Sequence, residues 1–239
     1  MNPTSPYQPL LLRLLHGLTG LCLVLAIATA FWTYNVYDGR WGTLPLPDYR
    51  AIEGIHGTFG VYTLLIFPAF LVYACRRGQR RLWQAETWKQ LIQGQGKTGR
   101  PQWWYGLNRG ANTLALLALL FALFSGKMMD ETWLPKGELA HFWYAAHLVS
   151  WVVMVLAIAL HLLLNAKIGG APLLVSMVRL KFRPKDDPRG WPGQVSAWWS
   201  RLDFHHRPTW LNQILPQSGL ERLGWLVLVL AWLLPLFKL

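Results

Sequence analysis

The chain has 239 residues, of which 53% are hydrophobic and 14% charged, and it contains fifteen tryptophans. This composition argues against a soluble domain. The formal charge of +12 could suggest a nucleic-acid partner, but the basic residues lie in particular segments between apolar runs, where they act as topology signals. We therefore exclude nucleic-acid binding. Cys22 and Cys75 form no CxxC motif, so zinc, iron–sulfur clusters and covalent haem are not expected.

Four apolar segments are long enough to cross about 30 Å of hydrocarbon as helices. They cover residues 10–34, 55–74, 112–128 and 141–164. A fifth run, residues 223–237, reaches only about 23 Å, so it either spans a thinned membrane or lies partly in the interface. The first run is too long for a signal peptide and is expected to be retained. The predicted fold is an all-α integral membrane protein, a four-helix transmembrane bundle with a short fifth C-terminal helix.

The distribution of charge predicts which loops face the cytoplasm. Residues 76–109 contain eight basic residues and one acid, and residues 167–222 contain nine basic and four acidic residues. The connections at residues 38–53 and 127–138 each have two basic and three acidic residues. Because Lys and Arg are enriched in cytoplasmic loops, both basic stretches and the N-terminus are expected on the cytoplasmic side.

Three regions follow from these predictions: a transmembrane domain (1–168), a cytoplasmic or interfacial segment (169–222) and a C-terminal hydrophobic helix (223–239). Tryptophan beside arginine suits the headgroup region, so the middle segment is expected along the membrane surface or against a partner. Its tryptophans are Trp191, Trp198, Trp199 and Trp210.

Four of the seven histidines fall in the predicted membrane helices, where an ionisable side chain is costly and indicates a function. His147 and His161 are fourteen residues apart, which puts them on one face of a helix about 21 Å apart. The alternating directions of the helices place His16 at the depth of His161, and His56 at the depth of His147. These two matched pairs fit the axial ligands of two haem irons.

Glycines beside two of these histidines support the haem prediction. His16 and His56 each begin an H-G-x-x-G pattern, which puts Gly20 and Gly60 on the same helix faces as the histidines. A glycine there leaves room for a flat macrocycle, although ordinary helix packing also favours small residues. His141 is expected to be an interfacial residue, and His205 and His206 are expected to be solvated.

The chain resembles the prokaryotic cytochrome b561 superfamily, which includes the cytochrome subunits of respiratory formate dehydrogenases and nickel–iron hydrogenases. Arg13-Leu14-Leu15-His16 in the first helix, one histidine in the second and the spaced pair in the fourth carry the resemblance, over about residues 10–170. It implies two non-covalent b haems with ligand pairs His16/His161 and His56/His147. It also implies a prokaryotic inner membrane or a thylakoid membrane.

A second element, Tyr105 to Gly110, lies just before the predicted third helix and is similar to the formate dehydrogenase subunits. The similarity makes Asn108 and Gly110 candidate contacts for a membrane quinone. Arg13 and Lys167 could bind propionates of the cytoplasmic-side haem, or could only anchor their helices at the membrane surface.

Three functions remain open from the sequence. The first is a quinone-linked cytochrome, alone or beside a partner redox subunit. The second is a superoxide:quinone oxidoreductase with its anion attracted by basic residues at the outer face, although the outer loops are net acidic. The third is a haem-free membrane scaffold or assembly protein whose histidines only pack. The basic residues available to the second are Arg40, Arg50, Lys127 and Lys136.

Overall fold

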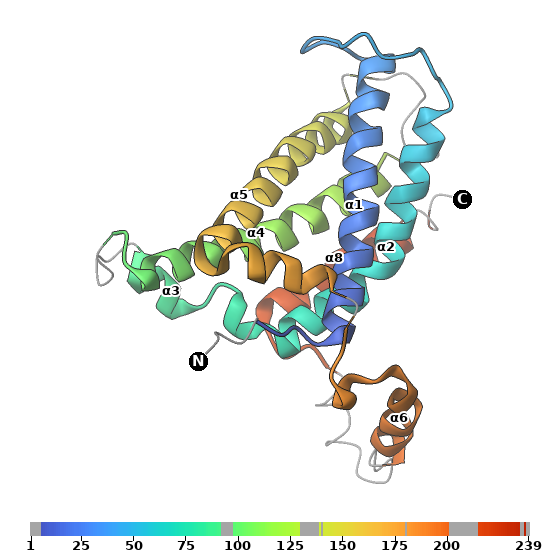
Figure 1. The fold of residues 1–239 in the computed structure, drawn as a ribbon. Helices are drawn as coiled ribbons and strands as arrows, with labels where there is room; N and C mark the ends of the chain where they lie inside the picture. The colour runs from blue at the N-terminus through green and yellow to red at the C-terminus, as the bar shows by residue number, and fades with distance from the viewer. Residues whose placement is uncertain are drawn as a thin grey trace.

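Every regular element is a helix in the residues that the computed structural model describes, which are 6–91, 98–129, 139, 141–179, 181–200, 215–234 and 237. Four helices are long and apolar enough to cross a membrane. They are α1 (Leu10–Tyr37), α2 (Ile52–Arg77), α4 (Pro101–Lys127) and α5 (Phe142–Val178). The prediction of an all-helical fold with four helices that could span a membrane is therefore confirmed in the described residues (Figure 1).

The long helices pack mainly as two hairpins, α1 against α2 and α4 against α5. A buried core joins the hairpins, with Phe67 and Leu71 from α2 against Leu119 and Leu120 from α4. Most other apolar side chains on the long helices are only partly buried or exposed, as expected for surfaces that face lipid. The hairpin arrangement brings the start of α1, the end of α2 and the start of α4 to one end of the molecule, which we call the basic end.

The helix that was predicted to begin at residue 112 is α4, and it starts eleven residues earlier, at Pro101. Proline occupies the first turn, where its missing N–H is not needed. The prediction followed the apolar run, whereas the helix continues through polar and aromatic residues at the basic end. Asn108 and Gly110 therefore lie inside α4 and not in a segment before it, which corrects their predicted setting.

The helix that was predicted to end near residue 164 is α5. It is also longer than predicted, because it bends and continues to Val178. Gly170 interrupts α5 with φ 61° and ψ −167°, a backbone conformation that essentially only glycine adopts. Pro172 follows in the next turn. In Figure 1 the final, orange part of α5 turns across the end of the bundle.

The short elements at the basic end are η1 (Gln79–Arg81), α3 (Ala85–Leu91), η2 (Pro184–Asp186), η3 (Pro188–Gly190) and α6 (Trp191–Ser200). On α6, Val195, Trp198 and Trp199 are exposed, so this helix presents a large apolar surface. Whether that surface meets lipid or a partner stays a prediction. Trp210, His205 and His206 lie outside the described residues.

The fifth apolar run forms α8 (Gly219–Leu233), four residues earlier at each end than predicted. Ser218 caps the helix by accepting a hydrogen bond from the Glu221 backbone N–H at 3.1 Å. The Glu221 carboxylate is fully buried and pairs with Arg76 Nε of α2 at 3.0 Å. Farther along, Leu228 packs into the core, so α8 is part of the same packed body as α2 and α4.

We expect Gly224→Ala to destabilise the protein by about 1–3 kcal/mol through overpacking. A methyl group at Gly224 would lie 2.2 Å from Cδ2 of Leu71, a side chain with no exposed surface in which to move. The control is Gly219→Ala, because a methyl group there meets nothing within 4 Å. Helix propensity favours alanine at interior positions, so a lower melting temperature for Gly224→Ala alone, measured in detergent, would identify the steric contact.

Candidate haem-binding site

The four predicted histidines come together as two facing pairs. His16 of α1 lies beside His161 of α5 with ring centroids 6.0 Å apart, and we call these two the basic-end pair. His56 of α2 lies beside His147 of α5, also with centroids 6.0 Å apart, and these form the far-end pair. The structure thus brings together the residues that were paired from helix direction and spacing. Their role as ligands stays a prediction.

The spacing within each pair fits one iron ion with an imidazole on either side. A metal–imidazole nitrogen bond is about 2 Å long and the ring centre lies about 1 Å beyond the nitrogen, so two axial ligands need centroids about 6 Å apart. Among the described residues, no group of three or more His, Cys, Asp or Glu side chains is arranged to hold a bare metal ion. Each pair therefore offers two donors, the number that a macrocycle-bound iron needs.

Hydrogen bonds leave Nε2 of both far-end histidines available to a metal. The Ala26 carbonyl lies 3.0 Å from Nδ1 of His56 and can only accept, so Nδ1 carries the proton. Ser125 Oγ lies 3.0 Å from Nδ1 of His147 and donates its own proton to the Phe121 carbonyl at 2.8 Å. Ser125 therefore accepts from His147. Partners of this kind fix the tautomer and orientation of a metal-ligating histidine.

At the basic-end pair, Asn112 sets the tautomer of His161. Asn112 Nδ2 donates to the Arg81 carbonyl at 2.8 Å, which leaves its Oδ1 facing Nδ1 of His161 at 2.8 Å. Since an amide oxygen only accepts, Nδ1 of His161 carries the proton and Nε2 is free for a metal. Besides facing His161, the His16 ring packs edge-on against Phe70, with ring centroids 5.6 Å apart.

The glycines near the pairs divide into two kinds. A Cβ atom added at Gly20 or Gly60 would meet nothing within 4 Å, so both predicted haem-packing positions border open space. By contrast, a Cβ atom at Gly126 of α4 would lie 3.0 Å from Cε1 of His147. Gly126 thus allows α4 to approach the far-end pair closely.

The two predicted propionate contacts, Arg13 and Lys167, have other partners in the structure. Arg13 is 5% exposed and its guanidinium donates to the backbone carbonyls of Arg179 and Lys181. Lys167 is exposed, with Nζ 5.4 Å from the centre of the Trp104 ring. These contacts suit residues that anchor helix ends, and the propionate role stays a prediction.

The predicted quinone contacts are near His161, but they face different neighbours. Asn108 Nδ2 donates to Asn165 at 3.4 Å, and Asn165 donates to the His161 carbonyl at 2.7 Å. Asn108 Oδ1 is buried and has no hydrogen-bond partner among the described residues. At Gly110, a Cβ atom would lie 3.2 Å from the Trp83 ring, so this glycine serves close packing.

Sequence reasoning missed Asn112 and Ser125, although both are polar residues inside a predicted membrane helix and polarity at that depth was a usable signal. The capping role of His141, which was predicted to be an interfacial residue, was also missed. In the structure His141 is the N-cap of α5, where Nδ1 accepts from the Trp143 backbone N–H at 3.2 Å.

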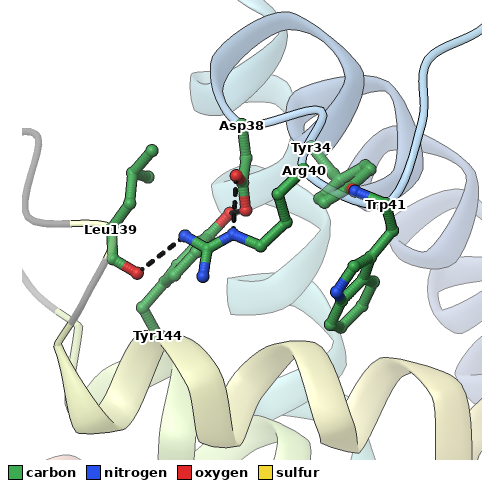
Figure 2. Close-up of polar contacts among 6 residues, drawn as sticks. All are labelled: Tyr34, Asp38, Arg40, Trp41, Leu139 and Tyr144. Atoms are coloured by element: carbon green, nitrogen blue, oxygen red, sulfur yellow. Dashed lines mark hydrogen bonds and ion pairs between the residues drawn. The ribbon is translucent and has the colours of Figure 1, made fainter.

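At the end of the molecule opposite the basic end, which we call the far end, a cluster of polar contacts joins α1 to α5 one turn before His147 (Figure 2). Asp38 accepts from Arg40 Nε at 2.8 Å and from the Tyr144 hydroxyl at 2.7 Å. Arg40 also donates to the Leu139 carbonyl at 2.9 Å, and Tyr34 accepts from the Trp41 backbone N–H. Burial alone would raise the pKa of Asp38, but the hydrogen bonds from Arg40 and Tyr144 hold that pKa below its ordinary value.

We expect Asp38→Asn to lower the free energy of unfolding at neutral pH by about 1 kcal/mol, because the buried carboxylate loses its charge and its ion pair with Arg40. The loss is small because the Arg40 side chain stays in contact with water. A carboxyl group with a depressed pKa stabilises the fold above its unfolded pKa of about 4. That contribution disappears as the pH falls through the folded pKa. The difference in melting temperature between wild type and Asp38→Asn should therefore close on acidification. A constant difference would contradict the ionic contribution.

A family model described as prokaryotic cytochrome b561 matches residues 7–179, which include both histidine pairs. The match covers the four long helices and ends before α6 and α8. Searches of curated proteins and of solved structures found no significant match. The chain therefore belongs to the prokaryotic cytochrome b561 family, whose members are membrane proteins of electron transport that carry b-type haem.

Proposed function

We propose that this protein carries electrons across a prokaryotic inner membrane or a thylakoid membrane through two b haems, and exchanges them with a membrane quinone. The observation that carries the proposal is two pairs of facing imidazoles, one near the start of α5 and one near its middle, each with ring centroids 6.0 Å apart. His16 and His161 would hold one haem, and His56 and His147 the other. Haem supplies one-electron chemistry when bound, with its potential set by ligands and surroundings.

The protein residues would act by orientation and exclusion. Each haem would be held by two imidazoles, an arrangement that favours electron transfer over binding of oxygen or a substrate at the metal. Ala26, Ser125 and Asn112 accept from Nδ1 of His56, His147 and His161, which would keep these rings in the tautomer that presents Nε2 to a metal. Fourteen residues of α5, or about 21 Å along the helix axis, separate His147 from His161.

The proposed orientation places the basic end in the cytoplasm, with the N-terminus. The described cations at this end include Arg80, Arg100 and Arg183, all exposed. Cytoplasmic enrichment in Lys and Arg supports this orientation. We also propose that α8 enters the membrane from the basic end beside α2, since Glu221 pairs with Arg76 and Leu228 packs into the core.

A quinone site near the basic-end pair is supported by Asn108. Its buried Oδ1 has no hydrogen-bond partner in the described part of the chain, and a quinol hydroxyl is a donor that could satisfy it. Asn165 links Asn108 to the backbone of His161, so a quinol there would lie next to one proposed ligand. A partner redox subunit would exchange electrons at one of the two membrane faces.

The described contacts do not favour superoxide oxidation at the far end. That function needs basic side chains to attract the anion, but Arg40 pairs with Asp38 at 2.8 Å. Arg50 is exposed, and Lys136 lies outside the described residues. The basic end carries the larger group of described cations.

The test is to purify the full chain in mild detergent and to record oxidised and reduced spectra with a pyridine haemochrome count. We expect two b haems per chain, both reduced by a short-chain quinol. Two haems without quinol reduction would reject the quinone partner only. A colourless protein after expression with ample haem would reject the cytochrome proposal and favour the haem-free scaffold.

A further inference from the structure

A cavity lies at the basic end, where the chain before α1 meets the chain after α5. Its volume is about 780 Å³, and its lining includes Tyr7, Arg13 and residues 179 and 181–183. Two hydrogen-bond sets hold the segments together: Tyr7 donates to Asp186, and Arg13 donates to the carbonyls of Arg179 and Lys181. We call this cavity the Tyr7 pocket.

The Tyr7 pocket is strongly cationic. Four basic side chains line it, and none of its described lining residues is acidic. Asp186 is nearby, but it bonds to the Tyr7 hydroxyl. Four like charges around one space repel one another, so an anion bound among them would be favoured. The basic side chains are Arg13, Arg179, Lys181 and Arg183.

Two of these cations pack against the Tyr7 ring, and one of them has an unsatisfied donor. The Arg183 guanidinium lies 4.1 Å from the centre of the Tyr7 ring, and that of Arg13 lies 5.6 Å from it, both within cation–π distance. In addition, Arg13 Nε is buried without a hydrogen-bond partner among the described residues. A buried donor on the wall of a cationic cavity is the group that an anionic acceptor would satisfy.

The position of the pocket indicates the source of the anion. Arg13 lies one turn inside the α1 span, and Arg179 follows the part of α5 that turns across the basic end after Gly170, so the pocket sits where a lipid headgroup would lie. Val178 and Phe182 are 75% and 45% exposed, which leaves apolar surface beside the cations for the start of an acyl chain. Basic pockets at the cytoplasmic ends of transmembrane helices bind anionic headgroups. We propose that the Tyr7 pocket binds the phosphate headgroup of an anionic phospholipid.

The test measures lipid binding to the delipidated full chain in detergent by native mass spectrometry. The probes are dioctanoyl phosphatidylglycerol, dioctanoyl phosphatidylcholine and inorganic phosphate. We expect wild type to prefer phosphatidylglycerol, and the double variant Lys181→Gln/Arg183→Gln to bind it about tenfold more weakly or worse. Arg13 is left unchanged because its backbone contacts hold the segments together.

The matched control is Arg80→Gln/Arg100→Gln, which removes the same charge from exposed positions at the same end but outside the pocket. It should bind phosphatidylglycerol like wild type. Equal weakening by both double variants would mean general surface attraction and would overturn the proposal. So would equal binding of phosphatidylcholine, or phosphate binding as tight as lipid binding. Loss of haem with unchanged lipid binding would instead assign these cations to haem propionates.

Discussion

His161→Ala is expected to leave one haem per chain where wild type holds two, and the haem that remains should be the one that also remains in His16→Ala. The two residues lie on helices α1 and α5, 145 positions apart in the sequence, and their ring centroids are 6.0 Å apart. Removing either imidazole leaves the iron one protein ligand short of the bis-histidine set. His56→Ala and His147→Ala should retain the other haem.

The measurement is a pyridine haemochrome count combined with a potentiometric titration of each variant. Wild type should titrate in two steps, and each alanine variant in one. Variants of the same pair should share a spectrum and a midpoint potential, which differ from those of the other pair. This grouping tests the pairing itself as well as the haem content.

The control for this series is His141→Ala, because His141 caps α5 at its N-terminus and belongs to neither pair. It should keep both haems. A series in which every histidine variant loses both haems would point to loss of the fold, and retention of two haems in His161→Ala would reject the ligand assignment. If His16→Ala and His147→Ala matched each other, the pairing would be wrong.

The helices and the histidine pairs were predictable because they follow from long-range regularities of the sequence. Apolar runs of membrane length define four spans, and their alternating directions fix which residues share a depth. The fourteen-residue interval between His147 and His161 then puts both on one face of α5. Those three facts predict the partners of His16 and His56, and the structure places them accordingly.

The details at the basic end were less predictable, because polar and aromatic residues there form helix without an apolar run. The start of α4 at Pro101 and the bend of α5 at Gly170 depend on local backbone geometry, which hydrophobicity does not report. The contribution of Gly224 depends on the approach of α8 to Leu71, a contact between segments more than 150 residues apart. Such contacts become visible only when the packing is known.

Asn112→Leu is expected to weaken haem retention at the basic-end pair by about 10–100-fold, the usual effect of removing a hydrogen bond to a metal-ligating histidine. Asn112 Oδ1 lies 2.8 Å from Nδ1 of His161, and the Arg81 carbonyl fixes the amide so that only the oxygen faces the ring. Leucine branches at the same carbon as asparagine, but it is larger and cannot accept the proton. The ring would then lose both its preferred tautomer and its fixed orientation.

Asn112→Asp separates this positioning role from simple packing. Aspartate keeps an oxygen that can accept from Nδ1 of His161, but like leucine it loses the hydrogen bond to the Arg81 carbonyl, so haem retention at the basic-end pair should exceed that of the leucine variant. Its negative charge would strengthen donation from the ring and stabilise the oxidised iron, which should lower the midpoint potential of that haem alone. Haem transfer to apomyoglobin would measure retention, and redox titration the potential. If the leucine and aspartate variants of Asn112 lost haem equally, the side chain would serve packing only. Better retention in the aspartate variant would establish that its oxygen orients the ligand.

Ser125→Ala should weaken haem retention at the far-end pair for the same reason, since Ser125 accepts from His147 at 3.0 Å.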